Sequence, residues 1–492
     1  MGSTFSSYHI AVSGMAANQS ALAVTTSNIS NINTAGYSRK QVSSVEQTVS
    51  QSNGTTAGTG VSLSEVLRAR DTLLDQTYRN QNAALNYWEV KENNLETIQE
   101  TLNEFTTSDD ADASESGLQQ IVADFFNSWE ELAKDPSSQS NRQSVLENAE
   151  SLISTMQDID AQLQQLQEDS VTQVQEGVTK LNDLAQQVAK LNGQITQQEL
   201  SGAEAGDLRD QRDSLLDQMS ALANIKVQES NGIMEVSIGG VSLVRGTETR
   251  ELKAVGDGTA ENPLQVQWAD LGSAADLTSG SIRAYLEDGD QSFNQVITTT
   301  PYDFSASSTS SIANLRQGLN DLLTTIATAL NALHTSGTDL DGDAGLDFFT
   351  AVDSSQPLSL SNIQVNPELE NDLDKVVTST QGQAGDGTIA EQIYQLTEQK
   401  IFKFDGLSVN LNDFYESLVA WVATAGNNAS SSYDTQNTLV KQVDNQRQSI
   451  SSVSLDEEMT KMMMYQKAYS ANAKVLSTMD SLLAELIDDL GS

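Results

Sequence analysis

The chain ends in a long stretch that repeats like the seam of a coiled coil. "KMMMYQKAYSANAKVLSTMDSLLAELI", from Lys461 to Ile487, contains neither Gly nor Pro, so it favours a helix. Apolar and small side chains recur in steps of four and three with one phase slip, as they do where helices pack along a shared line. The seam positions are Leu455, Met459, Met462, Gln466, Tyr469, Ala473, Leu476, Met479, Leu483, Leu486 and Leu490. A helix with this pattern needs a partner helix.

A second seam lies near the other end of the sequence, between Ser7 and Ile32. It also alternates in steps of four and three, through Ala11, Met15, Asn18, Leu22, Thr25, Ile29 and Ile32. The segment "NTAGYSRK" follows, and its Gly36 is a natural left-handed helix stop. We expect the two seams to pair with each other and with those of neighbouring copies of the chain.

The segments between the two seams are mostly helical in pattern, with a β-rich insert. Helical patterns cover about Glu65 to Phe105, Leu118 to Lys134, Ser140 to Leu200, Ile312 to His334, and the sequence from about Thr388 onward. Gln41 to Leu63 reads as extended loops or a hairpin. Period-two alternation around Asn231-Gly232 and Gly239-Gly240 predicts further hairpins within about 222–300.

These patterns predict a mainly α fold with a β insert (α+β), built on a long antiparallel coiled-coil bundle of both chain ends. We expect three domains. Residues 1–50 with 448–492 form a terminal coiled-coil domain, 51–221 with 305–447 form a helical bundle domain, and 222–304 form an outer β-rich domain.

Composition excludes several classes of function. The 26 basic and 68 acidic residues give a net charge of −42, which disfavours binding to nucleic acid or to anionic membranes. No cysteine is present, so disulfides and thiolate metal sites are excluded. No signal peptide is visible and no apolar stretch is long enough to span a bilayer, which by itself indicates a cytosolic protein. Residues Met1 to Val45 nevertheless contain no Asp or Glu, which suggests that this segment is kept free of negative charge.

The sequence contains little that predicts chemistry. The two histidines, His9 and His334, are far apart, and no nucleophile elbow or phosphate-binding loop occurs. "GDGTIA", from Gly385, has dinucleotide-like spacing but no preceding strand. "DLDGDAGLDFF", from Asp339, matches the first acidic positions of a calcium loop and then departs from it at Ala344 and Thr350. We therefore expect no catalytic, cofactor or metal site.

Both ends of the chain resemble known signatures. "AVSGMAANQSALAVTTSNISNINTAGYSRK" (Ala11 to Lys40) is similar to the N-terminal signature of bacterial flagellar axial proteins, which include rod, hook and hook-associated proteins. "SLDEEMTKMMMYQKAYSANAKVLSTMDSLLAELI" (Ser454 to Ile487) resembles their C-terminal signature, and its LDEEM form resembles the hook-associated members. "DFFNSWEELAKDPSS" and "DLRDQRDSLLDQMSAL" also resemble those members.

The resemblance implies a structural adaptor, without catalysis or cofactor, that joins hook to filament as a helical tubular assembly. It implies export by the flagellar type III apparatus without a cleaved signal, and an extracellular place at the hook–filament junction. The implied partners are further copies of the chain, the hook protein, the second hook–filament junction protein, and a cytosolic export chaperone at the C-terminal helix.

The same resemblance implies which residues carry assembly. On the N-terminal seam they are Ala11, Met15, Asn18, Leu22, Ile29, Ile32 and Gly36. On the C-terminal seam, which the chaperone would share, they are Leu455, Met459, Met462, Tyr469, Leu476, Leu483 and Leu486. Three alternatives stay open: another axial protein such as the hook protein or the second junction protein, a flagellar cell-wall hydrolase, and a secreted coiled-coil effector or adhesin.

Overall fold

The computed structural model describes residues 2–34, 36–50, 56–102, 117–200, 204–230, 233–291, 303–306 and 308–491. The chain forms two compact units. Unit 1 comprises Met1–Ala83, Lys180–Glu251 and Asn437–Ser492, and unit 2 comprises Ala84–Thr179 and Leu252–Gln436. Three helices supply residues to both units: α2 (Thr72–Leu102), α4 (Gln139–Leu200) and α10 (Leu411–Ser451). The three-domain division expected from the sequence remains a prediction, and the two compact units do not follow it.

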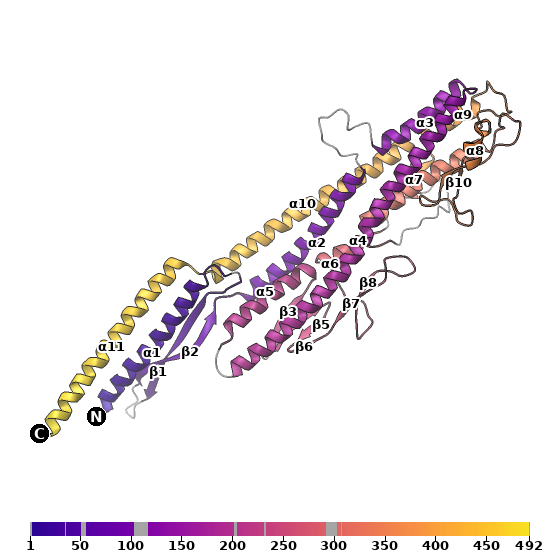
Figure 1. Cartoon of the computed structure of the whole chain (residues 1–492). Coiled ribbons are helices and arrows are strands. Elements are labelled where there is room, and N and C mark those ends of the chain that lie inside the picture. The colour runs from indigo at the N-terminus through magenta and orange to yellow at the C-terminus, as the bar shows by residue number, and fades with distance from the viewer. Residues whose placement is uncertain are drawn as a thin grey trace. The chain divides into compact units, whose positions relative to one another are not determined.

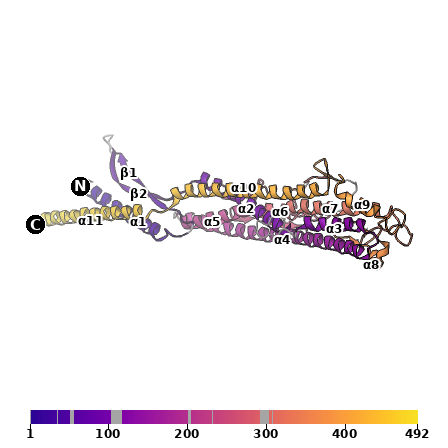
Figure 2. The ribbon, with the colours of Figure 1, turned by 90° about the horizontal axis from the view of Figure 1, so that it is seen from above.

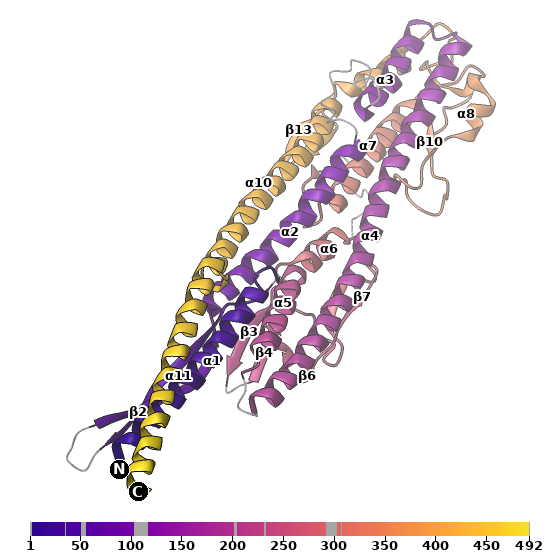
Figure 3. The ribbon, with the colours of Figure 1, turned by 60° about the vertical axis from the view of Figure 1, so that its left-hand side comes forward.

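The two ends of the chain form one antiparallel helix pair in unit 1. Helix α1 (Gly2–Ser30) lies beside α11 (Leu455–Gly491) in Figures 1 and 3. The direction is antiparallel because Asn28 contacts Glu458, whereas Gly14, one half-helix earlier, faces Asn472. The mainly α fold with long paired terminal helices and a β-containing middle is therefore confirmed.

A long hairpin packs on α1. Strand β1 (Lys40–Ser50) pairs antiparallel with β2 (Thr56–Arg68), from Lys40 opposite Arg68 to Ser50 opposite Thr56. Helix α1 contacts both α11 and this hairpin, and Figure 1 shows it between them. Figure 2 shows the same elements from above. The hairpin interpretation of this region was right, but the helix expected from Glu65 begins only at Thr72. Residues up to Arg68 pair with β1, and the Asp71 carboxylate then accepts the first free helix amides, those of Leu73 and Leu74.

Unit 1 also contains α5 (Gly206–Leu222) and a sheet of order β3-β4-β5-β6. The strands are β3 (Lys226–Ser230), β4 (Ile233–Ile238), β5 (Val241–Arg245) and β6 (Glu248–Thr249). On β4, Met234, Val236 and Ile238 are buried in strict alternation, as the period-two pattern predicted. The double glycine between β4 and β5 has positive φ at both residues, which a two-residue hairpin turn requires.

Unit 2 is a helical bundle with small strand pairs. Its further helices are α3 (Leu118–Lys134), α6 (Ser281–Asp288), α7 (Ser311–His334), α8 (Pro367–Asn371) and α9 (Thr388–Tyr394). Its strands are β7 (Leu252–Val255), β8 (Gln265–Trp268), β9 (Asp303–Phe304), β10 (Phe349–Thr350), β11 (Gln364–Val365), β12 (Phe402–Phe404) and β13 (Leu407–Val409). Single 3₁₀ turns occur at Leu373–Lys375 and Gln395–Thr397.

Helices dominate after Thr388 as expected, but the sequence analysis did not predict the strands β12 and β13 among them. Asp405 and Gly406 both adopt positive φ and turn the chain into a hairpin, and β12 adds in parallel to β9. An Asp-Gly pair between apolar residues is a strong hairpin signal, so "FDGLSV" carried the information.

The core of unit 2 is centred on α7. Its leucines at 315, 319, 322, 323 and 330 are fully buried, and aromatic side chains from α3, α10 and the loops surround the bundle. Phe348 lies within ring contact of Phe125, Trp129 and Phe349. Among the described residues no helix is long and apolar enough to cross a membrane.

Candidate assembly site

The sequence of α1 permits a close helix pair. The helix carries no Asp, Glu, Lys or Arg, and the side facing its neighbours is built from small residues. Ala11, Ala21 and Thr25 are buried there. A Cβ on Gly14 would lie 2.8 Å from the side-chain nitrogen of Asn472, so the glycine allows α11 to approach closely at this point.

Asn28 is the polar centre of this pair. Its side-chain amide nitrogen donates to the backbone oxygen of Lys40 and to Glu458 Oε2, both at 2.9 Å. Its amide oxygen accepts from the backbone N–H of Lys40 and from the hydroxyl of Tyr37. Asn28 and Glu458 are each 1% exposed. The side chain of Asn28 thus joins α1, the start of β1 and α11 in one hydrogen-bonded group.

Two further contacts surround this centre. Lys461 Nζ lies 2.8 Å from the second carboxylate oxygen of Glu458, so the buried acid has a cationic partner on its own helix. Arg39 pairs with Glu457, and its backbone N–H donates to the oxygen of Ser451 at the end of α10. The segments "SNIS" and "LDEEM", which belong to the two terminal signatures, therefore meet in space.

The N-terminal seam residues lie mostly on the inner side of α1. Ala11 and Thr25 are buried, and Met15, Asn18, Leu22 and Ile29 are half-buried. Ile32 is exposed, because α1 ends at Ser30 and this residue belongs to the turn that follows. Their role in assembly stays a prediction.

Gly36 does not stop α1 as the sequence analysis expected. It has a left-handed φ of 78°, but it lies six positions beyond the last helical residue. The helix ends earlier, where the Asn31 side chain donates back to the oxygen of Ser27. Gly36 instead turns the loop toward β1.

The C-terminal seam residues divide into two groups. Met462, Tyr469, Leu476 and Leu483 are half-buried on the side that carries Glu458 and Asn472. Leu455 and Met459 are exposed, because the side facing α1 in this first part of α11 carries Glu458 and Lys461 instead. The side chain of Leu486 lies outside the described residues. The assembly and chaperone roles of these positions remain predictions.

The hairpin is fixed on α1 by a single glycine. Gly60 has a φ of 135°, and a Cβ there would lie 2.3 Å from Ser13 Oγ. That hydroxyl accepts the backbone N–H of Val61 at 3.1 Å. Only glycine allows β2 to lie this close to α1.

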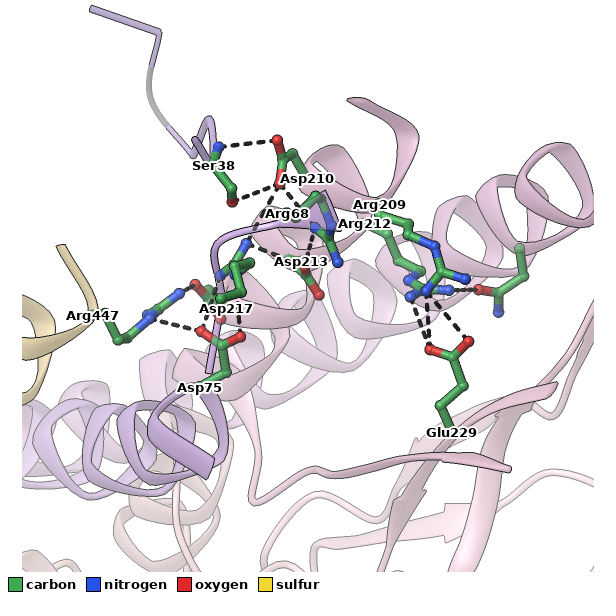
Figure 4. A network of polar contacts seen from close by, with 12 residues as sticks. Ser38, Arg68, Asp75, Arg209, Asp210, Arg212, Asp213, Asp217, Glu229 and Arg447 are labelled. Carbon is green, nitrogen blue, oxygen red and sulfur yellow. Dashed lines mark hydrogen bonds and ion pairs between the residues drawn. The ribbon is translucent and has the colours of Figure 1, made fainter. Parts of the chain in front are cut away.

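An ion-pair network connects the hairpin, α2 and α10 to α5 (Figure 4). On α5, Asp210, Asp213 and Asp217 follow at helical spacing and so share one face. Arginines from the end of β2, from the segment after it and from α2 converge on Asp213: Arg68 at 2.9 Å, Arg70 at 3.1 Å and Arg79 at 3.4 Å. Burial opposes ionisation of Asp213, but the guanidiniums of Arg70, Arg68 and Arg79 prevail and lower its pKa.

Arg447 extends the network to α10. Its guanidinium contacts Asp75 at 2.9 Å and Asp217 at 2.8 Å, and it lies 4.1 Å from the ring centre of Tyr78. At the other end, the backbone N–H and the hydroxyl of Ser38 both donate to Asp210. Three segments distant in sequence, at 38, 68–79 and 447, therefore meet on one face of α5.

A second cluster on α5 faces α4 and β3. Arg209 pairs with Glu199 at 2.7 Å. Figure 4 shows Arg209 and Arg212 directed at Glu229, at 3.3 and 3.4 Å, and Arg212 also donates to the amide oxygen of Asn192. The segment "DLRDQRDSLLDQ" thus places acids on one face of α5 and arginines on another, and each face binds a different neighbour.

The loop between α1 and β1 is bordered by two clefts of unit 1. One, of about 380 Å³, lies between this loop, Tyr78, Asp444 and Arg447. The other, of about 820 Å³, lies between the same loop, Lys190 of α4 and Asp207 of α5. Both are open and polar, and they leave the loop accessible on two sides.

The acidic loop from Asp339 is a hydrogen-bonded turn. Asp339 is buried, and its carboxylate accepts the backbone N–H of Asp343 at 2.8 Å. Within the described part of the chain no three His, Cys, Asp or Glu side chains are grouped as a metal site would need. In "GDGTIA", Gly387 precedes α9, and a Cβ there would lie 2.4 Å from the oxygen of Ala133, so close packing on α3 accounts for this glycine.

Comparison with known proteins finds similarity to flagellar proteins at both ends and in the middle of the chain. A family model described as "Flagellar hook-associated protein FlgK helical domain" matches residues 110–349. Models of the flagellar basal body rod proteins match 9–37 and, at the C-terminal end, 445–489. Flagellar hook-associated protein 1 of Bacillus subtilis is 29% identical over 100% of this chain and 99% of its own length. The chain is similar to flagellar hook-associated protein 1 over its whole length.

Two further proteins show the same similarity. Flagellar hook-associated protein 1 of Escherichia coli is 26% identical over 97% of this chain and 98% of its own length. The structure of the flagellar hook junction protein FlgK from Burkholderia pseudomallei covers 76% of this chain and all of that chain, with a TM-score of 0.59 at 16% identity, which supports the fold. These similarities support a structural role in the bacterial flagellum.

Sequence reasoning missed the polar groups that hold unit 1 together. Asn28 and Glu458 fall next to seam positions, where a search for apolar repeats ignores them. The acids at 210, 213 and 217 have visible helical spacing, and Arg68 and Arg70 follow a predicted hairpin, so a search for complementary charges would have suggested the network.

Proposed function

We propose that this chain is a structural adaptor that joins the flagellar hook to the filament, and that copies of it assemble through α1 and α11 into a tubular lattice. The observation that carries the proposal is the pairing of the two chain ends around Asn28 and Glu458. This pairing brings the two terminal sequence signatures together in one helix pair. It leaves apolar side chains of that helix pair exposed, which is typical of a surface that binds a partner.

The exposed side chains lie on both helices. On α1 they include Tyr8, Ile10 and Val12, and on α11 they include Leu455, Met459, Met463, Met464, Val475 and Leu482. A chain with a net charge of −42 repels its own copies over most of its surface. Because α1 is free of charged Asp, Glu, Lys and Arg, it is the element on which copies can approach with least repulsion.

We propose further that the chain has no catalytic role. Its two histidines support this, since His9 lies on α1 and His334 is enclosed in the core of unit 2. The buried acids and arginines of unit 1 neutralise one another, as in a structural network.

The proposed partners are copies of the chain, the hook protein, the second hook–filament junction protein and an export chaperone. The chain would leave the cell through the flagellar type III apparatus without a cleaved signal and act outside the cell. Before assembly, the side of α11 with Met462, Tyr469, Leu476 and Leu483 has no lattice to enter. An amphipathic helix of this kind suits a groove on a chaperone.

Immunogold labelling of purified flagella tests where along the flagellum this protein lies. Gold confined to the junction between hook and filament is expected. Gold along the hook or the filament would instead favour another axial protein, and gold on the cell wall would favour a hydrolase.

A pull-down from cells tests the shared side of α11. Leu476→Asp combined with Leu483→Asp should lose both the chaperone and incorporation into flagella, because both leucines lie on the half-buried side. Lys474→Ala, at an exposed position of the same helix, is the matched control and should lose neither. Undiminished chaperone binding by the double variant would refute the shared-side proposal.

A further inference from the structure

Two titratable side chains are enclosed on α7, the helix at the centre of unit 2. Asp321 is 1% exposed and His334 is 0% exposed. A charged group in a protein interior is costly unless an opposite charge or several hydrogen bonds compensate it. The contacts of both side chains therefore indicate which protonation state the fold accepts.

The surroundings of Asp321 suit a neutral carboxyl group. Its Oδ1 accepts from the side-chain nitrogen of Gln317 at 2.6 Å, while its Oδ2 has no hydrogen-bond partner. The amide oxygen of Gln317 is buried without a partner as well. A carboxyl and an amide can pair through two hydrogen bonds only if the carboxyl carries a proton to donate. One proton on Oδ2 would thus give both oxygens a partner.

No charge compensates Asp321. The neighbouring Arg316 turns its guanidinium to Asp160 and Gln167 of α4, at 2.6 to 2.9 Å. The side chains that act on Asp321 are Gln317 and Asn320, both neutral and both on α7, and no charged group of another element is among them. Burial is the largest influence, and it raises the pKa of Asp321 to about 8.

The surroundings of His334 require a neutral ring. Nε2 accepts the backbone N–H of Val377 at 2.9 Å, and Nδ1 lies 2.5 Å from the backbone oxygen of Leu346, to which it donates. Protonation of Nε2 would set one N–H against another. Burial, with Arg142 of α4 adding to it, lowers the pKa of His334 to about 4, against the opposing effects of the Leu346 carbonyl and Asp339.

We propose that α7 is a pH-gated element, which packs firmly in unit 2 only while Asp321 holds a proton and His334 does not. Asp321 then gives unit 2 an alkaline limit, and His334 gives an acid loss of stability that Asp321 offsets in the unsubstituted chain. The raised pKa of Asp321 contributes stability that is complete below its unfolded value and is lost as the pH rises toward 8. The lowered pKa of His334 has the opposite sign, and stability is lost as the pH falls from about 6.5 toward 4.

The two effects overlap between about pH 4 and 6.5, and there they oppose each other. Each group alone changes the folding constant by about tenfold per pH unit, so together they leave it nearly constant. Between about pH 6.5 and 8 only Asp321 acts, and the folding constant of unit 2 should fall by about tenfold per pH unit.

Intrinsic fluorescence reports on unit 2 alone, because the four tryptophans of the chain, at 88, 129, 268 and 421, all belong to it. Urea unfolding of the full chain would be followed at intervals from pH 4.5 to 9 for four variants: Asp321→Asn, His334→Gln, the double variant, and Asp158→Asn. Asp158 is an exposed acid on α4 in the same unit and is the matched control.

Asp321→Asn should abolish the alkaline loss and reveal a loss on acidification below pH 6.5. His334→Gln should reveal a loss of stability as the pH rises from about 4. The double variant should be nearly flat relative to Asp158→Asn, which should follow the unsubstituted chain. If Asp321→Asn and the unsubstituted chain depend on pH in the same way between 6 and 9, the proposal fails.

Infrared difference spectroscopy gives a readout that stability cannot mimic. At pH 7 the folded chain should show the absorption of a protonated carboxyl group, and Asp321→Asn should remove it while Asp158→Asn keeps it. The absence of that absorption from the unsubstituted chain would also overturn the proposal.

Discussion

The side-chain amide of Asn28 lies 2.9 Å from the carboxylate of Glu458, across 430 positions of sequence. Both side chains are buried, so removing either one takes a hydrogen bond from the other at a position that water does not reach. Helical propensity and apolar spacing bring α1 and α11 together, and this hydrogen bond fixes how far one slides along the other.

Asn28→Asp should loosen the terminal pair. The change removes the two donated hydrogen bonds and sets a second carboxylate against Glu458, which we expect to cost roughly 2–4 kcal/mol. Hydrogen exchange of the α1 amides in assembled material, where this helix is expected to be protected, measures the effect. Gln19→Glu, the same amide-to-acid change at an exposed position of the same helix, should leave exchange nearly unchanged, and similar acceleration by both would contradict the role of Asn28.

Gly60→Ala should detach the hairpin from α1. The added Cβ meets Ser13 Oγ, and the positive φ alone costs about 1–2 kcal/mol for a residue with a side chain. Faster exchange of the amides of β1 and β2 is expected. Gly58→Ala is the matched change two residues away, where φ is not positive and the Cβ meets only the end of the Glu46 side chain at 3.2 Å, and it should be mild.

Asp213→Asn should destabilise unit 1 by about 3–5 kcal/mol, since three arginines would lose their shared anion. Asp207→Asn on the same helix breaks only the pair with Lys40, in which the aspartate is largely exposed, and should cost under about 1 kcal/mol. Chemical denaturation, monitored through hydrogen exchange of the α5 amides, distinguishes the two variants. Equal losses of stability for both variants would show that the buried network stabilises unit 1 no more than one exposed ion pair does.

The same network predicts an acid limit for unit 1. The pKa of Asp213 is lowered in the folded chain, so its stabilising contribution is complete above its unfolded pKa of about 3.9 and is lost as the pH falls through the folded value. Protection of the α5 amides should therefore decline below about pH 4. In Asp213→Asn this part of the decline should be missing.

The free chain should exchange amide hydrogens quickly in α1 and α11, and the assembled lattice should protect them. In the single chain α11 leaves Leu455, Met459 and Leu482 exposed, so only one side of the helix is covered. Exchange on dilute protein, checked as monomeric, can be compared with exchange on assembled material. Strong protection across both helices in the monomer would argue against assembly-dependent order.

The elements that sequence predicted best are those with a long periodic pattern. The helix expected from Leu118 to Lys134 has those bounds in the structure, and that from Ile312 to His334 begins one residue earlier. The pairing of both chain ends also followed from their seams. The start of α2 was misplaced because Glu65 to Arg68 suit a helix locally but pair with β1, a non-local choice that periodicity cannot see.

The polar part of the site was harder to predict. Asn28 is an ordinary solvent-facing residue type, and its burial depends on Glu458 lying beside it after the whole chain has folded. Asp321 gave no signal either, because one acid among 68 acidic residues is not distinguishable until burial is known. Apolar repeats report on which faces are covered, whereas buried polar groups depend on particular partners.

Because α1 pairs with α11, this part of the fold can form only after the last helix has been synthesised. The ribosome releases α1 first and the partner carboxylate 430 residues later, a delay of roughly 20–90 s at ordinary bacterial rates. During that interval α1 has no partner helix within its own chain. A product that stops before Glu458 never acquires one, so a truncated polypeptide carries an unmatched first helix. The hydrogen bond between Asn28 and Glu458 can therefore form only in a chain that has been translated as far as its last helix.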